Sequence, residues 1–86
     1  MRAIIRTHRS LDYGVVDHFS LELIEEAIEL DGSDPDFYKV KAIILEDMGD
    51  YEEALKYYDI SLEKGHSQVV QNNKARALAR IAMDNI

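Results

Sequence analysis

The sequence predicts an all-α protein made of short helices that pack in antiparallel pairs. Apolar residues recur along it at the three- and four-residue spacing of helices rather than at the two-residue spacing of strands. Connections of about three residues force consecutive helices to pack antiparallel. Glycine, which commonly follows the end of a helix, recurs every 16 to 18 residues, at Gly14, Gly32, Gly49 and Gly65.

The first expected helix covers about residues 2–13, and the second runs from about residue 17 to residue 31. Asp17 is a candidate N-cap for the second helix, because its side chain can accept a hydrogen bond from a free backbone amide. The apolar residues of this second segment recur at helical spacing, at Phe19, Leu23, Ala27 and Leu30.

The third expected helix has the clearest start signal in the chain. Asp34 can cap it, and Pro35 suits the first helical position, where its missing N–H costs nothing. The helix continues to Gly49. A fourth helix opens at Asp50, with Glu53 at the spacing of a capping box. Its apolar stripe consists of Tyr51, Ala54, Leu55, Tyr58 and Leu62.

The fifth expected helix starts near Ser67 and closes the stack. One side is polar, and we expect it to face water; it carries Asn72, Arg76 and Arg80. Another side is apolar; it carries Val70, Ala77, Leu78 and Ile81.

The composition excludes several functional classes. The formal net charge of -7 argues against nucleic acid and anionic membranes as main partners. The lack of cysteine excludes disulfides and thiolate metal sites. No stretch approaches the length of a membrane span, and no secretory signal is visible. Residues 1–11 carry Arg without acid, as a mitochondrial presequence would, but we take them as the first helix of a soluble cytoplasmic protein.

An internal repeat becomes visible when residues 35–68 are laid over residues 1–34. Leu11 then meets Leu45, Ile24 meets Tyr58, and the helix phases agree. A shift of about 34 residues is the period of the tetratricopeptide repeat. The stretch Gly49-Asp50-Tyr51-Glu52-Glu53-Ala54-Leu55 resembles the turn and second-helix opening of that family, and Phe37-Tyr38-Lys39-Val40-Lys41-Ala42 resembles the start of its first helix.

The resemblance implies a right-handed α-α superhelix of two antiparallel helix pairs plus a C-terminal capping helix. Residues 1–86 would form one domain, with a degenerate first repeat over 1–34, a second repeat over 35–66 and the capping helix over 67–86. Three residues depart from the family pattern. Gly32 and His66 stand where proline is usual, and Lys41 stands where a large apolar residue is expected.

The resemblance also implies a function, which is to bind a peptide or a partner protein in a groove lined by the first helix of each repeat. Segments 17–31 and 50–64 hold eleven acidic and two basic residues, whereas the rest of the chain holds six and eight. The groove side is therefore the basic one and would suit an acidic, partly apolar peptide. The expected partner-binding residues are Arg2, Arg6, Arg9, Lys39, Val40, Ile43 and Lys74.

Other interpretations stay open at this stage. The groove charges could simply be solubilising, because exposed ion pairs contribute only about 0–1 kcal/mol. The chain could instead be a structural module that self-associates through its terminal helices. A helical subunit of an enzyme is a third interpretation, but no catalytic set is visible, so we expect no enzymatic activity and no cofactor. We also expect no metal site, because His8, His18 and His66 lie far apart.

Overall fold

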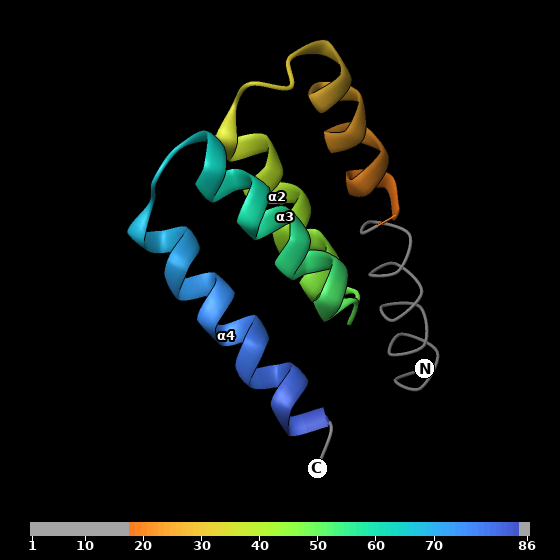
Figure 1. Ribbon diagram of the computed structural model, residues 1–86. Helices are drawn as coiled ribbons and strands as arrows, with labels where there is room; N and C mark the ends of the chain where they lie inside the picture. Colours follow the sequence, from red (N-terminus) through yellow and green to blue (C-terminus); the bar gives the residue numbers. More distant parts are fainter. Residues whose placement is uncertain (1–17, 85–86) are drawn as a thin grey trace, which may run out of the picture.

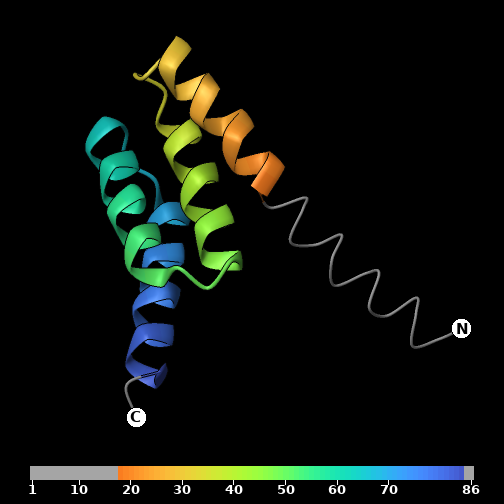
Figure 2. The ribbon, with the colours of Figure 1, turned by 90° about the vertical axis from the view of Figure 1, so that its right-hand side faces the viewer.

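The computed structural model describes residues 18–84. This part of the chain consists of helices joined by short irregular connections and contains no strand. A helix over residues 18–30 is followed by α2 (Pro35–Asp47), α3 (Tyr51–Lys64) and α4 (Gln68–Asp84). Consecutive helices run antiparallel; α3 packs against both α2 and α4, and helix 18–30 lies on the other side of α2 (Figures 1 and 2). The predicted all-α class and hairpin packing are confirmed, whereas the expected helix over residues 2–13 lies outside the described residues.

The start and the end of α2 follow the sequence signals. The side chain of Asp34 accepts a hydrogen bond of 2.9 Å from the backbone amide of Asp36, and Pro35 is the first helical residue. At the other end, Gly49 has a positive φ of 87°. Its amide donates to the carbonyl of Glu46, and the amide of Asp50 donates to that of Leu45. This pair of bonds is a Schellman motif, which satisfies carbonyls left free by the helix end.

Two other local predictions differ from the structure. Gly65 is extended, with φ at -169°, and not left-handed. It is needed there for space, because a Cβ atom at this position would lie 2.9 Å from Cγ of Pro35. Asp50 makes no side-chain capping bond, so the predicted capping box with Glu53 does not form. Its carbonyl still accepts the first intrahelical bond, from Ala54.

The core lies where α2, α3 and α4 meet, and most of its side chains are small. Fully buried alanines let the helix axes approach closely, and Tyr58 fills the remaining space. Ser61 is also buried, and its hydroxyl donates to the carbonyl of Pro35 at 2.9 Å, tying the end of α3 to the start of α2. The buried apolar residues are Ala42, Leu45, Ala54, Tyr58, Val70 and Ala77.

Helix 18–30 is less completely packed than the α2–α3 pair. Its Leu21 contacts the edge of the core. The stripe of Phe19, Leu23 and Leu30 is largely exposed, with relative exposures of 63, 57 and 89 %. Within residues 18–84, none of the helices is long and apolar enough to cross a bilayer.

Candidate partner-binding surface

Three of the predicted binding residues lie on α2. Lys39 is half-buried, with its Nζ 3.7 Å from a carboxylate oxygen of Asp36. Val40 is exposed, and Ile43 packs against the edge of the core. Their spacing of one to four residues places them on one side of the helix, away from the face that carries Ala42 and Leu45. This side therefore offers an ammonium group and apolar surface next to each other.

A buried carboxylate joins α2 to both following helices. Glu46 is only 2 % exposed, and it accepts a hydrogen bond of 2.7 Å from the hydroxyl of Tyr58 on α3. Arg76 on α4 binds it through two nitrogens, with Nε at 2.8 Å and Nη2 at 2.9 Å. Arg80, one helical turn further on, places its Nε 3.6 Å from the same carboxylate. Glu46 therefore links α2 to both α3 and α4.

The electrostatics of this cluster follow from its geometry. The hydrogen bonds from Arg76 hold the pKa of Glu46 below its usual value, although burial works in the opposite direction. Burial and the neighbouring carboxylate raise the pKa of the Tyr58 hydroxyl. At neutral pH, Glu46 is therefore charged and Tyr58 is a neutral donor. A charged group this deeply buried is tolerated because all of its close partners are donors.

This cluster adds a contact to the exposed side of the last helix. The side containing Asn72, Arg76 and Arg80 was expected to face water. All three residues are exposed, as expected, and Arg76 and Arg80 in addition bind Glu46 while about half of each side chain stays in solvent. Sequence spacing could not reveal this, because the partners lie 30 residues apart. A weak signal was present, since Glu46 follows the small residue Ala42 by one helical turn on the buried side of α2.

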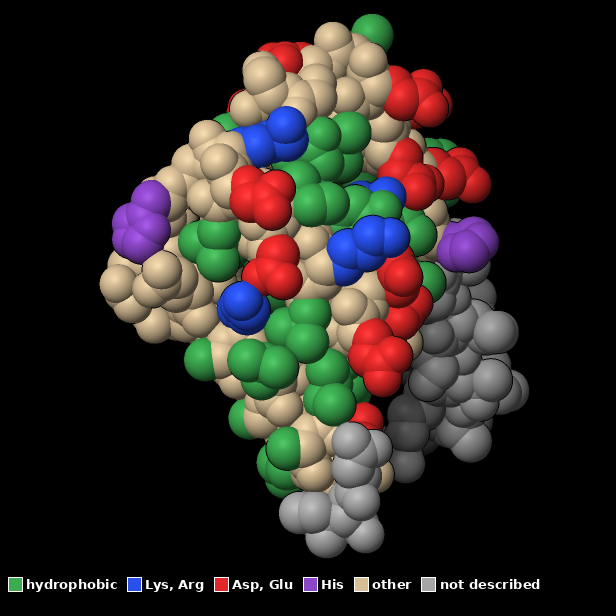
Figure 3. Space-filling model, viewed as in Figure 1, with side chains coloured by type: hydrophobic (Ala, Val, Ile, Leu, Met, Phe, Trp, Pro, Cys, Tyr) green, Lys and Arg blue, Asp and Glu red, His purple; other side chains and the backbone are tan. Residues whose placement is uncertain are grey.

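The remaining predicted binding residues are placed differently. The ammonium of Lys74 lies 2.6 Å from a carboxylate oxygen of Asp59 on α3. It is thus engaged on the α3 side of α4, and not next to Lys39. Arg2, Arg6 and Arg9 lie outside the described residues. On the face seen in Figure 3, acidic side chains gather toward helix 18–30, with basic ones between them.

Lys41, which departs from the family pattern, has a defined place in the packing. Its side chain is only 12 % exposed, and its Nζ lies 3.1 Å from Glu25 on helix 18–30. The same ammonium lies 4.1 Å from the centre of the Tyr57 ring. Burial alone would lower the pKa of Lys41, but Tyr57 and Glu25 outweigh it and raise the pKa. Its aliphatic stem replaces the expected apolar side chain, and its charge links helix 18–30 to α3.

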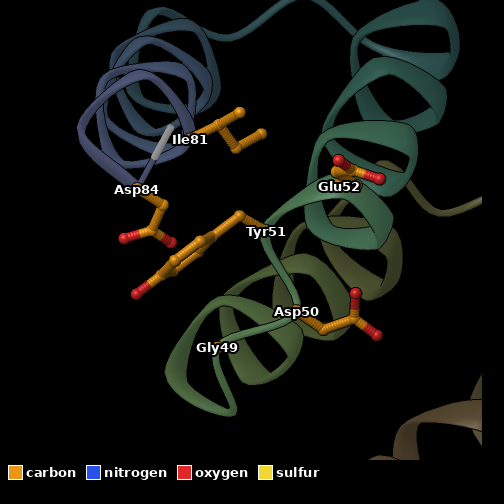
Figure 4. A pocket seen from close by; sticks show the side chains of 6 residues that line it. All are labelled: Gly49, Asp50, Tyr51, Glu52, Ile81 and Asp84. Carbon is orange, nitrogen blue, oxygen red and sulfur yellow. The ribbon is translucent and has the colours of Figure 1, made fainter. Parts of the chain in front are cut away.

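An open pocket lies between the α2–α3 turn and the end of α4 (Figure 4). Its volume is ≈ 290 Å³. Tyr51 and Ile81 form its apolar wall, whereas the carboxylates of Asp50 and Glu52 point away from it. Arg80 lies 5.8 Å from the centre of the Tyr51 ring. The pocket holds no nucleophile paired with a base, so its composition suits contact with a side chain more than chemistry.

Two histidines, His18 and His66, lie within the described residues. Both are exposed. Between residues 18 and 84, no cluster of three or more His, Asp or Glu side chains could hold a metal ion. His8 lies outside this range. The expectation of no metal site and no cofactor stays a prediction for the whole chain.

Comparison with known proteins gives one result. Residues 23–56 match a family model described as "Tetratricopeptide repeat". This segment runs from helix 18–30 through α2 into the opening of α3, so the resemblance to this family is confirmed over it. No curated protein and no solved structure was found to match the chain. The tetratricopeptide repeat is in general a protein–protein interaction module, and it is typically not catalytic.

Proposed function

We propose that this protein binds a peptide or a partner protein in the groove lined by the first helices of the repeats, and that it catalyses no reaction. The observation that carries the proposal is the hydrogen-bonded tie between Glu46 on α2 and Arg76 on α4. This tie links α2 to α4, and it supports the proposal because exposed side chains of both helices can then contribute to one binding surface. A groove of this kind can hold an extended or helical segment of another protein.

The exposed side chains of this surface suggest the chemistry of the partner. Lys39 and Val40 offer a charge and an apolar contact on α2. On α4, Val69 is exposed on the same face as Arg76, two helical turns away. The side chains of Arg76 and Arg80 are about half exposed, although both bind Glu46. An acidic, partly apolar peptide fits this set, because arginine binds carboxylates well.

Affinity capture from the source cell with charge-reversal variants tests this function. Lys39→Glu, on the groove side of α2, should abolish capture of the partner while the circular-dichroism spectrum stays helical. Arg6→Glu makes the corresponding test of the predicted first helix. The matched control is Lys56→Glu, which makes the same charge change on the exposed side of α3. Capture that survives Lys39→Glu and Arg6→Glu would reject the groove as the binding site.

Self-association through the terminal helices is the second candidate function. It is favoured by the large exposed apolar side chains at both ends of the described part, such as Leu23 on helix 18–30 and Met83 on α4. Light scattering over a dilution series separates the two functions. A chain that stays monomeric at every concentration would reject self-association.

A further inference from the structure

The pocket between the α2–α3 turn and the end of α4 combines an aromatic ring with a carboxylate. Tyr51 and Ile81 supply its apolar wall, and the side chain of Asp84 extends from α4 toward the Tyr51 ring (Figure 4). Tyr51 is only partly buried, so surface of its ring stays accessible. A volume of ≈ 290 Å³ has room for one long side chain of another molecule.

Carboxylates outnumber cations around this pocket. Asp50, Glu52 and Asp84 all line it and are all exposed. None of the three forms an ion pair with another residue between 18 and 84. Asp50 and Glu52 point away from the hollow, so they act on an occupant through their longer-range field, whereas Asp84 can contact it directly.

Arg80 is a cation beside the pocket, but it does not cancel this charge. Its Nε lies 3.6 Å from Glu46, its guanidinium carbon lies 5.8 Å from the centre of the Tyr51 ring, and it is not a lining residue. Even when Arg80 is counted in full, one positive charge faces three negative ones. Helix α4 also has no basic residue in its last turn, so the negative end of its dipole favours a further cation here.

The combination of ring and carboxylate selects among cations. A planar guanidinium can stack on the face of an aromatic ring and donate paired hydrogen bonds to a carboxylate at the same time. An ammonium group acts as a point charge and lacks the planar stack. An apolar side chain would leave Asp84 without a partner, and an anionic one would be repelled.

We propose that this pocket binds an arginine side chain of a partner protein, with the guanidinium over the Tyr51 ring and against the Asp84 carboxylate. The site selects a positive charge, whereas the groove of the proposed function selects an acidic segment. The two sites use different residues, so either proposal can fail alone.

The probe for this site is N-acetylarginine methylamide, which carries one positive charge and no charged terminus. Titration of the full chain to ~50 mM probe, followed by ¹H–¹⁵N NMR, should shift the amides of residues 49–52 and 81–84. The contacts are exposed and individually weak, so we expect a dissociation constant on the order of 10 mM. The lysine analogue should bind more weakly, and the norleucine and glutamate analogues should leave these amides unshifted.

Two variants test the assigned contacts. Asp84→Asn and Tyr51→Leu should each weaken binding of the arginine probe by about 2- to 5-fold, with an unchanged helical circular-dichroism spectrum. Glu63→Gln is the matched control, because it removes an exposed carboxylate near the other end of α3 and should bind the probe as the wild type does. Lys39→Glu should also bind it normally, which keeps the groove proposal separate.

Three results would overturn the proposal. The norleucine analogue could shift the same amides as strongly, which would show an apolar hollow without preference for charge. The shifts with the arginine probe could spread over the acidic surface and survive Asp84→Asn, which would indicate a non-specific counter-ion. The amides of residues 49–52 and 81–84 could stay unshifted up to ~50 mM probe, which would show that the pocket takes no cation.

Discussion

Helix 18–30 and the α2–α3 pair carry apolar stripes of similar spacing, yet they use them differently. In α2 and α3, the residues at the repeat positions Ala42, Ala54 and Tyr58 are completely buried. In helix 18–30, Leu23 and Leu30 are exposed. Helical periodicity thus shows that a helix has an apolar face, but it does not show whether another helix covers that face. Burial is decided by the neighbouring helix, and small residues mark where that neighbour comes close.

The largest expected effect is the removal of the aromatic ring at the centre of the core. Tyr58→Ala deletes a completely buried ring and leaves Glu46 without its hydroxyl donor. We expect a loss of about 4 kcal/mol in the free energy of unfolding. Because small domains have only about 5 kcal/mol in total, this variant should be largely unfolded. Urea denaturation followed by circular dichroism measures the effect, and a loss below about 1 kcal/mol would contradict the packing described.

The second prediction concerns the carboxylate that joins the three helices. Glu46→Ala leaves Tyr58 without its acceptor and Arg76 without its partner, and we expect a loss of about 2–3 kcal/mol. This is less than for a completely buried pair, because Arg76 remains half in solvent. Glu46→Gln should cost less, since an amide oxygen can still accept. Equal free energies of unfolding for Glu46→Ala and the wild type would show that the cluster does not stabilise the fold.

The same carboxylate predicts a dependence on pH. The folded-state pKa of Glu46 is lowered by Arg76, so its contribution to stability is fully present above the pKa of the unfolded chain, about 4.3. The contribution is lost as pH falls through the lower folded-state pKa. Between pH 7 and pH 3, the wild type should therefore lose more stability than Glu46→Gln does. Parallel stability curves for the two proteins would contradict this assignment.

A smaller effect is expected at the turn between α2 and α3. Gly49 has a positive φ, and a Cβ atom there would meet no other atom within 4 Å. The cost of Gly49→Ala is therefore purely conformational, about 1 kcal/mol. Thermal unfolding should show a melting temperature lower by about 4–8 °C. An unchanged melting temperature would mean that the turn adopts another conformation in solution.

The smallest effect is expected on helix 18–30, at the other side of the comparison. Leu30→Ala removes a side chain that is 89 % exposed, so we expect a change within about 0.5 kcal/mol. Urea denaturation followed by circular dichroism is the appropriate measurement. A loss comparable to that of a core leucine, above about 2 kcal/mol, would show that this face is packed.

Much of the fold could be predicted from the sequence because its signals are local. The cap at Asp34, the proline after it and the left-handed Gly49 each act within one helical turn. The tie between Glu46 and Arg76 could not be predicted, because it depends on where two distant helices come together. The burial of Lys41 was missed for a similar reason. Lys41 departs from the family pattern, and its contacts with Tyr57 and Glu25 depend on how helix 18–30 and α3 pack against α2.

The candidate site was less accessible to prediction than the fold. Lys39, Val40 and Ile43 share one side of α2, as helical spacing requires. The placement of Lys74 depended on a partner in another helix, Asp59, which spacing cannot reveal. Which charges meet across a stack is set by the relative rotation of the helices, and a single sequence carries little information on that rotation.

The attachment of Arg76 and Arg80 to Glu46 has a consequence for how α4 opens. The tie holds the middle of α4 to the α2–α3 hairpin, so α4 cannot separate without exposing the buried carboxylate. Amide protons from about Val70 to Arg80 should then exchange with solvent at the same slow rate as those of the hairpin, as one cooperative unit. Amides beyond Arg80 lie past the last anchor and should exchange faster.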